Sequence, residues 1–230
     1  PHLADLLEEL CKLDFHWIRL HYLYPEWIDD RLIDVIARED KILKYLDIPL
    51  QHCNDKILKK MNRRGDKKYL CALLDKLRER IPGLVLRTSI IAGLPGEGEE
   101  EFDELCDFLR EQKLLRAGVF PYSPEEGTRA AKMERVDSDE AARRAERIVD
   151  IQSEIIDAWN DERQGDVMEV LCEGFDGQSM LFVGRSYAES PDIDGRIYFS
   201  APRDVAAGEF VPVRITGAMD GELTGELAEE

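Results

Sequence analysis

The sequence predicts an α/β protein, a partial parallel sheet or barrel with helices, followed by a small antiparallel β-barrel. The first observation is the stretch 84–110, where an apolar run breaks at Gly93 and Pro95-Gly96 and apolar residues then recur at helical spacing. The second is the alternation of four such strands with helices. The third is a change after Gly165 to short strand-like runs separated by Gly, Asp and Pro. We therefore expect two domains, residues 1–164 and 165–230.

The elements expected before residue 84 alternate between helix and strand. In chain order they are a helix over 1–12, a strand over 17–24 that stops at Pro25, a helix over 29–38, a strand over 45–51, and helices over 55–61 and 66–80. Asn54 can cap the helix that begins at residue 55, and Gly65 would end that helix.

A strand over 114–122 follows the central unit and is the fourth of the sheet. Four strands cannot close a full barrel, so we expect the parallel part to be partial or truncated. Ser138 would cap a long helix over 139–163. The barrel strands are expected within 167–172, 180–184, 195–199 and 209–216.

The composition indicates a globular protein of a reducing compartment. The chain has 230 residues, 43% of them hydrophobic, and five widely scattered cysteines with no CxxC-type pair. No apolar run approaches the roughly 20 residues of a membrane span. We expect a cytoplasmic protein, a monomer, with no membrane partner. The chain begins inside a helical pattern without an initiator Met, so we also expect earlier parts of the protein to be missing.

The charge balance bears on the choice of partner. The formal net charge is −18, and residues 165–230 hold four Arg and no Lys against 14 acids, hence −10. Such a surface repels phosphate backbones, so nucleic-acid binding through the barrel is not expected and a basic protein partner fits better. An acidic surface that serves only solubility would explain the charge equally well.

Two polar residues interrupt the apolar strand 84–92 and mark a candidate site. By period-two alternation Arg87, Ser89 and Ile91 share one face of the strand. The following glycine loop lies at the carboxyl end of a parallel strand, where ligands bind in such folds. A ligand carboxylate could pair with Arg87, and pairing with a neighbouring Asp or Glu is an equally good explanation.

Four short runs occur in a fixed order along the chain. They are Tyr45-Leu-Asp-Ile-Pro-Leu-Gln-His52, Leu58-Lys-Lys-Met-Asn-Arg63, Leu86-Arg-Thr-Ser-Ile-Ile-Ala-Gly-Leu-Pro-Gly-Glu97 and Tyr122-Ser-Pro-Glu-Glu-Gly-Thr128. In that order, before a barrel that resembles a TRAM domain (OB-like), they resemble the radical S-adenosylmethionine (SAM) methylthiotransferases. The run from Gly184 to Gly195 is similar to the RimO branch, which modifies a ribosomal protein.

The resemblance implies a fold, a reaction and cofactors. It implies a cluster-binding domain before this chain, then a partial TIM-like radical SAM barrel and the TRAM barrel. The implied enzyme is a transferase that replaces a C–H on the β-carbon of an aspartate, in the twelfth protein of the small ribosomal subunit, with C–SCH3. It implies SAM and two [4Fe-4S] clusters. The CxxxCxxC loop of the family has no counterpart here, so no residue is assigned as a metal ligand, and the fragment alone is expected to be inactive.

The resemblance also suggests which residues meet SAM. Gln51, Arg87 and Ser89 would contact its ribose or methionine carboxylate. The turn from Gly93 to Glu97 and the strand end from Phe120 to Tyr122 would border the adenine. No catalytic residue is assigned. Gly98 stands where the family usually has Thr or Ser, and Gly also caps helices. Cys53 lies beside the proposed pocket and is expected to be a small buried hydrophobe.

Two other functions fit parts of the sequence. A tRNA methylthiotransferase of the same family would bind RNA through its TRAM barrel, which the charge of −10 and the Ser190-Pro-Asp-Ile-Asp194 segment disfavour. A substrate- and cofactor-binding module without activity in isolation is the other alternative.

Overall fold

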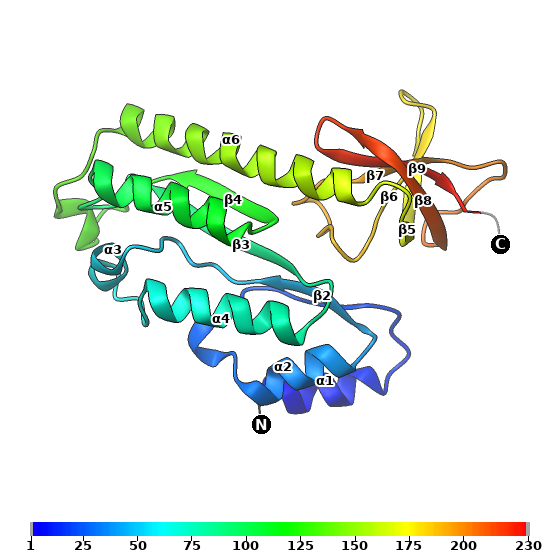
Figure 1. Ribbon diagram of the computed structural model, residues 1–230, viewed down its shortest axis with the longest axis horizontal. Coiled ribbons are helices and arrows are strands. Elements are labelled where there is room, and N and C mark those ends of the chain that lie inside the picture. The colour runs from blue at the N-terminus through cyan, green and yellow to red at the C-terminus, as the bar shows by residue number, and fades with distance from the viewer. Residues whose placement is uncertain (1, 229–230) are drawn as a thin grey trace. The chain divides into compact units, whose positions relative to one another are not determined.

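The computed structural model describes residues 2–228, and the chain divides into two compact units, Pro1–Gln152 and Ser153–Glu230. The first unit is a parallel sheet with helices between its strands (Figure 1). Its elements are α1 (Leu3–Cys11), β1 (Ile18–Leu20), η1 (Pro25–Trp27), α2 (Asp30–Arg38), β2 (Ile42–Asp47), α3 (Asp55–Lys60), α4 (Lys67–Arg80), β3 (Val85–Ala92), α5 (Glu99–Gln112), β4 (Arg116–Pro121), η2 (Ala130–Lys132) and α6 (Ser138–Glu162). Helix α6 continues into the second unit.

The four strands stand in the order β1-β2-β3-β4 and every neighbouring pair is parallel. This open, partial barrel confirms the predicted architecture of the first part. Asp47, Arg87 and Arg116 are register partners on the three adjacent strands. Partners in register point to the same face of a sheet, so these three charged residues share one face.

The helices cover the sheet with the faces that their sequence periodicity predicts. Leu70, Leu73, Leu74 and Leu77 of α4 are all buried, as are Phe102, Leu105, Cys106 and Leu109 of α5. Burying one such Leu or Phe side chain contributes about 1.5–3 kcal/mol before conformational entropy is subtracted. This burial fixes the ends of the strands, where the candidate site lies.

The strands are shorter than the sequence predicts, and the reason is local backbone geometry. Strand β1 ends at Leu20 because Tyr22 has a left-handed φ of 58°, and Pro25 then opens a 3₁₀ turn. Strand β2 begins at Ile42 and ends at Asp47. Gln51, with a φ of 70°, reaches β3 only through an isolated bridge to Ile90.

Two expected helix boundaries are also wrong. Helix α3 ends at Lys60, and Gly65 does not cap it but precedes Asp66, which caps α4 by accepting a hydrogen bond from the Tyr69 amide. The cap of α6 is Asp137, whose carboxylate accepts from the Glu140 amide at 2.8 Å, while Ser138 is already the first helical residue. Asn54 caps α3 as expected.

The second unit contains a closed five-stranded barrel. Its strands are β5 (Val167–Asp176), β6 (Leu181–Arg185), β7 (Ile197–Ser200), β8 (Phe210–Met219) and β9 (Glu222–Leu227), in the order β5-β6-β7-β9-β8. All neighbouring pairs are antiparallel except β7 and β9, which are parallel. Strand β9 was not expected because its sequence has only two large apolar residues, Leu223 and Leu227.

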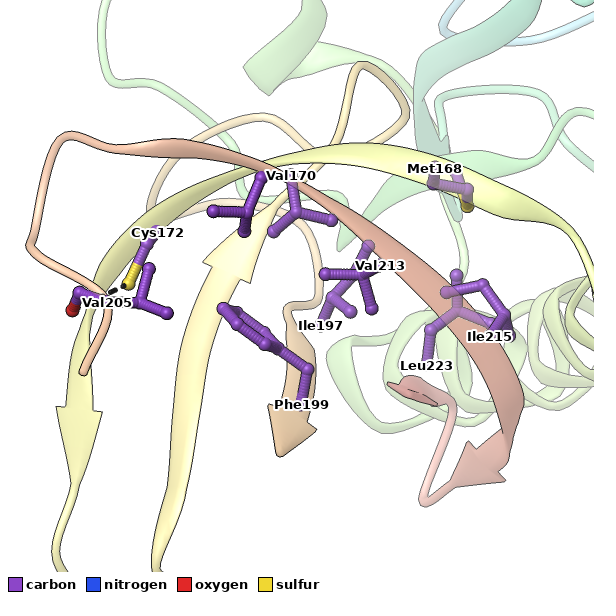
Figure 2. Packing of buried hydrophobic residues seen from close by; sticks show 10 residues of the cluster. Met168, Val170, Cys172, Ile197, Phe199, Val205, Val213, Ile215 and Leu223 are labelled. Atoms are coloured by element: carbon purple, nitrogen blue, oxygen red, sulfur yellow. Dashed lines mark hydrogen bonds between the residues drawn. The ribbon is translucent and has the colours of Figure 1, made fainter. Parts of the chain in front are cut away.

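The barrel interior is filled by alternate residues of its strands (Figure 2). Val170, Ile197, Phe199 and Val213 are fully buried there. Gly225 allows the strands to close, because a Cβ at this position would lie 2.5 Å from the Arg214 carbonyl oxygen. No helix in the described part of the chain has the length and apolar character to cross a membrane.

Candidate functional site

The candidate site lies on the polar face of the sheet. Arg87 is 8% exposed and Ser89 and Ile91 are half-buried, whereas Thr88 and Ile90 on the opposite face are fully covered. Helices cover the second face, so the first faces the inside of the partial barrel. Sequence alternation predicts this division of β3 into an apolar and a polar face.

Arg87 forms a buried ion pair with Asp47. The Nη1 atom of Arg87 lies 3.0 Å from Oδ1 of Asp47, and both side chains are almost fully buried. Gly118 on β4 leaves room for the guanidinium, since a Cβ there would lie 3.3 Å from Nη2 of Arg87. The structure therefore contains the ion pair with a neighbouring Asp that is one of the two explanations for Arg87.

Further charged and aromatic groups stand on the same face. Nδ1 of His21 lies 3.7 Å from Oδ2 of Asp47, and the guanidinium of Arg19 lies 4.3 Å from the centre of the Tyr45 ring. Arg116 is the buried register partner of Arg87. Sequence reasoning missed these residues. The sequence holds one signal that could have found Asp47 and Arg116. A charged residue in each of two neighbouring buried parallel strands indicates that the strands share a polar face.

The backbone of Gln51 has an unusual conformation. Its φ of 70° lies in the left-handed region that residues with a Cβ rarely adopt. Two hydrogen bonds hold it there: its amide donates to the Ser89 carbonyl at 2.8 Å, and its carbonyl accepts from the Ile91 amide at 3.0 Å. Such strain clusters at ligand-binding sites, where the surrounding structure enforces it.

Gly93 allows the loop after β3 to turn sharply beneath α6. Its φ is +81°, and a Cβ would lie only 2.5 Å from Cβ of Ala141. Its amide donates to Oε1 of Glu97 at 2.9 Å. Glycine is required here both by the backbone angle and by the contact with the helix.

The buried side chain of Glu97 holds the loop that follows β3. Its side chain is fully buried, with Oε1 2.9 Å from Nη1 of Arg144 and Oε2 3.2 Å from Nε2 of His52. Burial alone raises the pKa of the Glu97 carboxyl, but the contact with the His52 ring and the hydrogen bonds from Arg144 and the Gly93 amide outweigh it and hold this pKa below its ordinary value. The carboxylate thus holds the loop in place.

The neighbours of His52 fix the orientation of its ring. Nδ1 accepts a hydrogen bond from the Asn54 amide at 3.0 Å, so Nδ1 carries no proton. The other ring nitrogen, Nε2, faces the Glu97 carboxylate at 3.2 Å. One buried ring therefore joins the start of α3 to the loop after β3.

The remaining predicted residues border two neighbouring hollows. Tyr122 is half-buried and lines a cavity of about 490 Å³ together with residues 133–138. Glu97 and the preceding Pro95-Gly96 line a cavity of about 510 Å³, whose other wall is residues 133–136. Phe120 is 54% exposed at the end of β4, in register with Ile91.

The structure brings the backbone of Gln51 against Ser89 in the second half of β3, and Arg87 lies two residues before Ser89 on the same face. Gly93, Glu97 and Tyr122 lie around the loop beyond it. Within residues 2–228, His, Cys, Asp and Glu form no group of three or more that could hold a metal ion. The Cys53 thiol is fully buried, which raises its pKa, and it behaves as a small apolar residue.

Two family models match the chain. Residues 1–109 match the Radical SAM superfamily and residues 165–228 match the TRAM domain. Among solved structures, coproporphyrinogen III oxidase (HemN) from Escherichia coli aligns with a TM-score of 0.55 at 20% identity, over 66% of this chain and 36% of that chain. At this identity the similarity supports the fold alone.

Curated relatives match over the whole chain. "Ribosomal protein uS12 methylthiotransferase RimO" of Symbiobacterium thermophilum is 46% identical over 100% of this chain and 48% of the relative. The proteins of the same name from Acetivibrio thermocellus and Myxococcus xanthus are 43% and 46% identical, over 99% and 100% of this chain and 51% and 48% of theirs. The chain thus spans about half the length of these relatives.

Proposed function

Because the chain belongs to the radical SAM methylthiotransferase family, RimO branch, we propose that it acts in the transfer of a methylthio group to the β-carbon of an aspartate in ribosomal protein uS12. One observation carries this proposal: relatives that match the chain from end to end at 41–46% identity are named for that activity. The geometry at the end of β3 supports a cofactor site in the same chain.

The residues at this edge fit SAM in their chemistry. A guanidinium, an amide and a hydroxyl, from Arg87, Gln51 and Ser89, suit a carboxylate and ribose hydroxyls. We propose that a flat base meets the backbone of this turn at Pro95 and Gly96, which line the cavity of about 510 Å³. We assign the polar contacts to these three side chains, and the border of the adenine to the Gly93–Glu97 turn and the strand end from Phe120 to Tyr122.

Glu97 has a supporting part in this site. Its carboxylate is occupied by His52, Arg144 and the Gly93 amide, so it holds the turn while the backbone of the turn meets the ligand. Hydrogen abstraction and methyl donation are chemistry that bound SAM and two [4Fe-4S] clusters supply in this family. The described residues offer no ligand set for a cluster.

The acidic barrel is the part that would meet the protein substrate. Residues 165–230 carry a net charge of −10, and ribosomal proteins that bind RNA are basic. Complementary charge speeds association and favours the basic partner. A ribosomal substrate supports a cytoplasmic location, and we propose that the enzyme acts there as a monomer.

The activity is tested with the whole protein carrying its clusters. Incubation with SAM, a low-potential one-electron reductant, a sulfide source and purified uS12 should add one SCH2 unit to a single aspartate, as seen by mass spectrometry of the digested substrate. Bulk tRNA is the competing substrate, and methylthiolation of tRNA without change in uS12 would contradict the proposal.

The cofactor site is tested by calorimetric titration of SAM. Arg87→Lys keeps the charge but loses the planar fork of donors, so we expect SAM to bind at least about tenfold more weakly. Arg78→Lys is the matched control, because Arg78 is partly buried and bonds to Gln112. Equal weakening in both variants, or in neither, would show that Arg87 does not contact SAM.

A further inference from the structure

One segment is positively charged although the protein as a whole is negatively charged. Residues 55–68, which form α3 and lead into α4, hold seven basic and two acidic side chains in a chain whose net charge is −18. The basic residues are Lys56, Lys59, Lys60, Arg63, Arg64, Lys67 and Lys68. Both acids serve local structure: Asp55 accepts from the Lys67 amide and Asp66 from the Tyr69 amide.

Most of these cations have no acidic partner. Lys56 pairs with Glu101 at 3.0 Å and Lys67 with Glu104 at 3.2 Å. Lys59, Lys60, Arg64 and Lys68 are exposed, and within residues 2–228 no carboxylate lies within ion-pair distance of them. Four unneutralised charges on one short segment attract a polyanion.

Exposed aromatic rings adjoin the basic segment. Tyr22, Tyr24 and Trp27 are 68%, 50% and 72% exposed in and before the 3₁₀ turn η1. Two contacts join this loop to the basic segment and α4. The guanidinium of Arg63 lies 5.5 Å from the centre of the Tyr24 ring, and the Tyr69 hydroxyl donates to the Pro25 carbonyl at 2.9 Å. The loop with these rings therefore adjoins the basic segment, and we call the two together the basic–aromatic surface.

The same surface reaches the candidate site. The ammonium of Lys60 lies directly over Gly96, where a Cβ would collide with it, and Lys60 lines the cavity shared with Glu97. In Figure 1, α3 lies at the end of the sheet where α5 begins, and Lys56 bonds to Glu101 of α5 there. A polymer held on this surface would pass the mouth of the site.

We propose that the basic–aromatic surface binds a single-stranded segment of RNA. Lysines and arginines neutralise phosphates, and exposed rings stack on bases, which is how single strands are held without sequence preference. A run of Asp and Glu residues would use the cations but carries no aromatic ring to stack on Tyr22, Tyr24 and Trp27. The proposal concerns the first unit, apart from the acidic barrel, and it holds whether or not uS12 is the substrate.

Binding is measured by fluorescence anisotropy of a labelled oligouridine of about 12 nucleotides, with the whole protein, between about 50 and 200 mM salt. The variant Lys59→Ala, Lys60→Ala, Arg64→Ala, Lys68→Ala should bind at least about tenfold more weakly. Each cation on a phosphate contributes about −0.7 to the slope of log K against log salt, so the slope should flatten by about 2 to 3.

A matched variant removes the same charge elsewhere in the first unit. Lys12→Ala, Lys76→Ala, Arg110→Ala, Arg143→Ala deletes four cations that each pair with a carboxylate. Its affinity and salt slope should stay close to those of the unaltered protein. Equal losses in the two variants would overturn the proposal, because net charge alone would then explain binding.

The rings are tested apart from the charges. Trp27→Ala and Tyr24→Ala should each weaken binding by about fivefold or more while leaving the salt slope unchanged, because stacking releases no counterions. Phe175→Ala, 53% exposed on the barrel, is the control and should have no effect. Unchanged affinity in both ring variants, or competition by polyglutamate as effective as by unlabelled RNA, would contradict an RNA site.

Discussion

Single residues of the first unit fix the loop that follows β3. Gly93 has a φ of +81° and lies against Ala141, and Glu97 joins this loop to His52 and Arg144. Gly93 is needed for its backbone angle and its lack of a Cβ, and Glu97 for the position of its two carboxylate oxygens. Their contributions can be separated because matched positions exist elsewhere in the chain.

Gly93→Ala should destabilise the first unit more than Gly127→Ala does. Both glycines have a φ of +81°, so the backbone cost of about 1 kcal/mol is shared. Only at Gly93 would the new methyl overlap a neighbour, because nothing lies within 4 Å of a Cβ at Gly127. The difference in unfolding free energy, measured with urea, should be about 1–3 kcal/mol. Equal losses would mean that Ala141 moves away freely.

Glu97→Gln should reduce stability in a way that depends on pH. The pKa of Glu97 is lowered from 4.5 in the folded protein, so its carboxylate stabilises the fold fully above pH 4.5 and loses this effect as pH falls below that value. The unfolding free energy of the variant should be lower by about 1–3 kcal/mol at pH 7.

The gap between unaltered protein and Glu97→Gln should narrow in urea titrations at acidic pH. Glu100→Gln, on an exposed residue of the following helix α5, should change stability by less than about 0.5 kcal/mol throughout. A gap that stays constant down to pH 3 would show that the Glu97 charge contributes nothing.

At the scale of elements, capping side chains decide where helices begin. Asn54, Asp66 and Asp137 each accept a hydrogen bond from an amide of the first turn. The cap of α3 was predicted correctly at Asn54. The cap of α6 was predicted at Ser138, one residue after the true cap Asp137, because both residue types are good caps. Only the backbone angles of the folded chain select between such neighbours.

The cap of α6 gives a direct comparison of two adjacent residues. Asp137→Ala should cost about 1 kcal/mol because it removes the acceptor of the Glu140 amide. Ser138→Ala should change the unfolding free energy by less than about 0.5 kcal/mol, since Ser138 is already helical. Thermal melts of the two variants decide the matter, and a larger loss for Ser138→Ala would reverse the assignment.

At the scale of the whole molecule, the barrel has a buried core of its own. Phe199→Ala removes a fully buried ring from this core and should cost about 3–5 kcal/mol. Phe175→Ala removes a ring that is 53% exposed and should cost far less. Calorimetry should show the Phe199 variant losing stability in the transition of the second unit. A similar small shift in both variants would contradict this core.

The order of strands and helices and the apolar faces of α4 and α5 could be predicted from the sequence, because periodicity is a local property. Within the candidate site, Arg87 and Ser89 were recognisable as polar residues in an apolar strand. Asp47 and Arg116 are also charged residues in apolar strands, but their proximity to Arg87 requires the register of the parallel strands, and His21 lies outside any strand. His52 and Arg144 are 45 and 47 residues from Glu97, and no local pattern indicates that contact.

The sequence by itself determined the architecture of a partial parallel barrel and a small β-barrel, the family, and the residues of the loop after β3. Only the tertiary structure decided that Arg87 pairs with Asp47, that Glu97 turns inward to His52 and Arg144, and that exposed rings adjoin the basic segment 55–68. The physical reason is that periodicity and capping act between near neighbours in the chain, whereas ion pairs and surfaces join residues that only folding brings together.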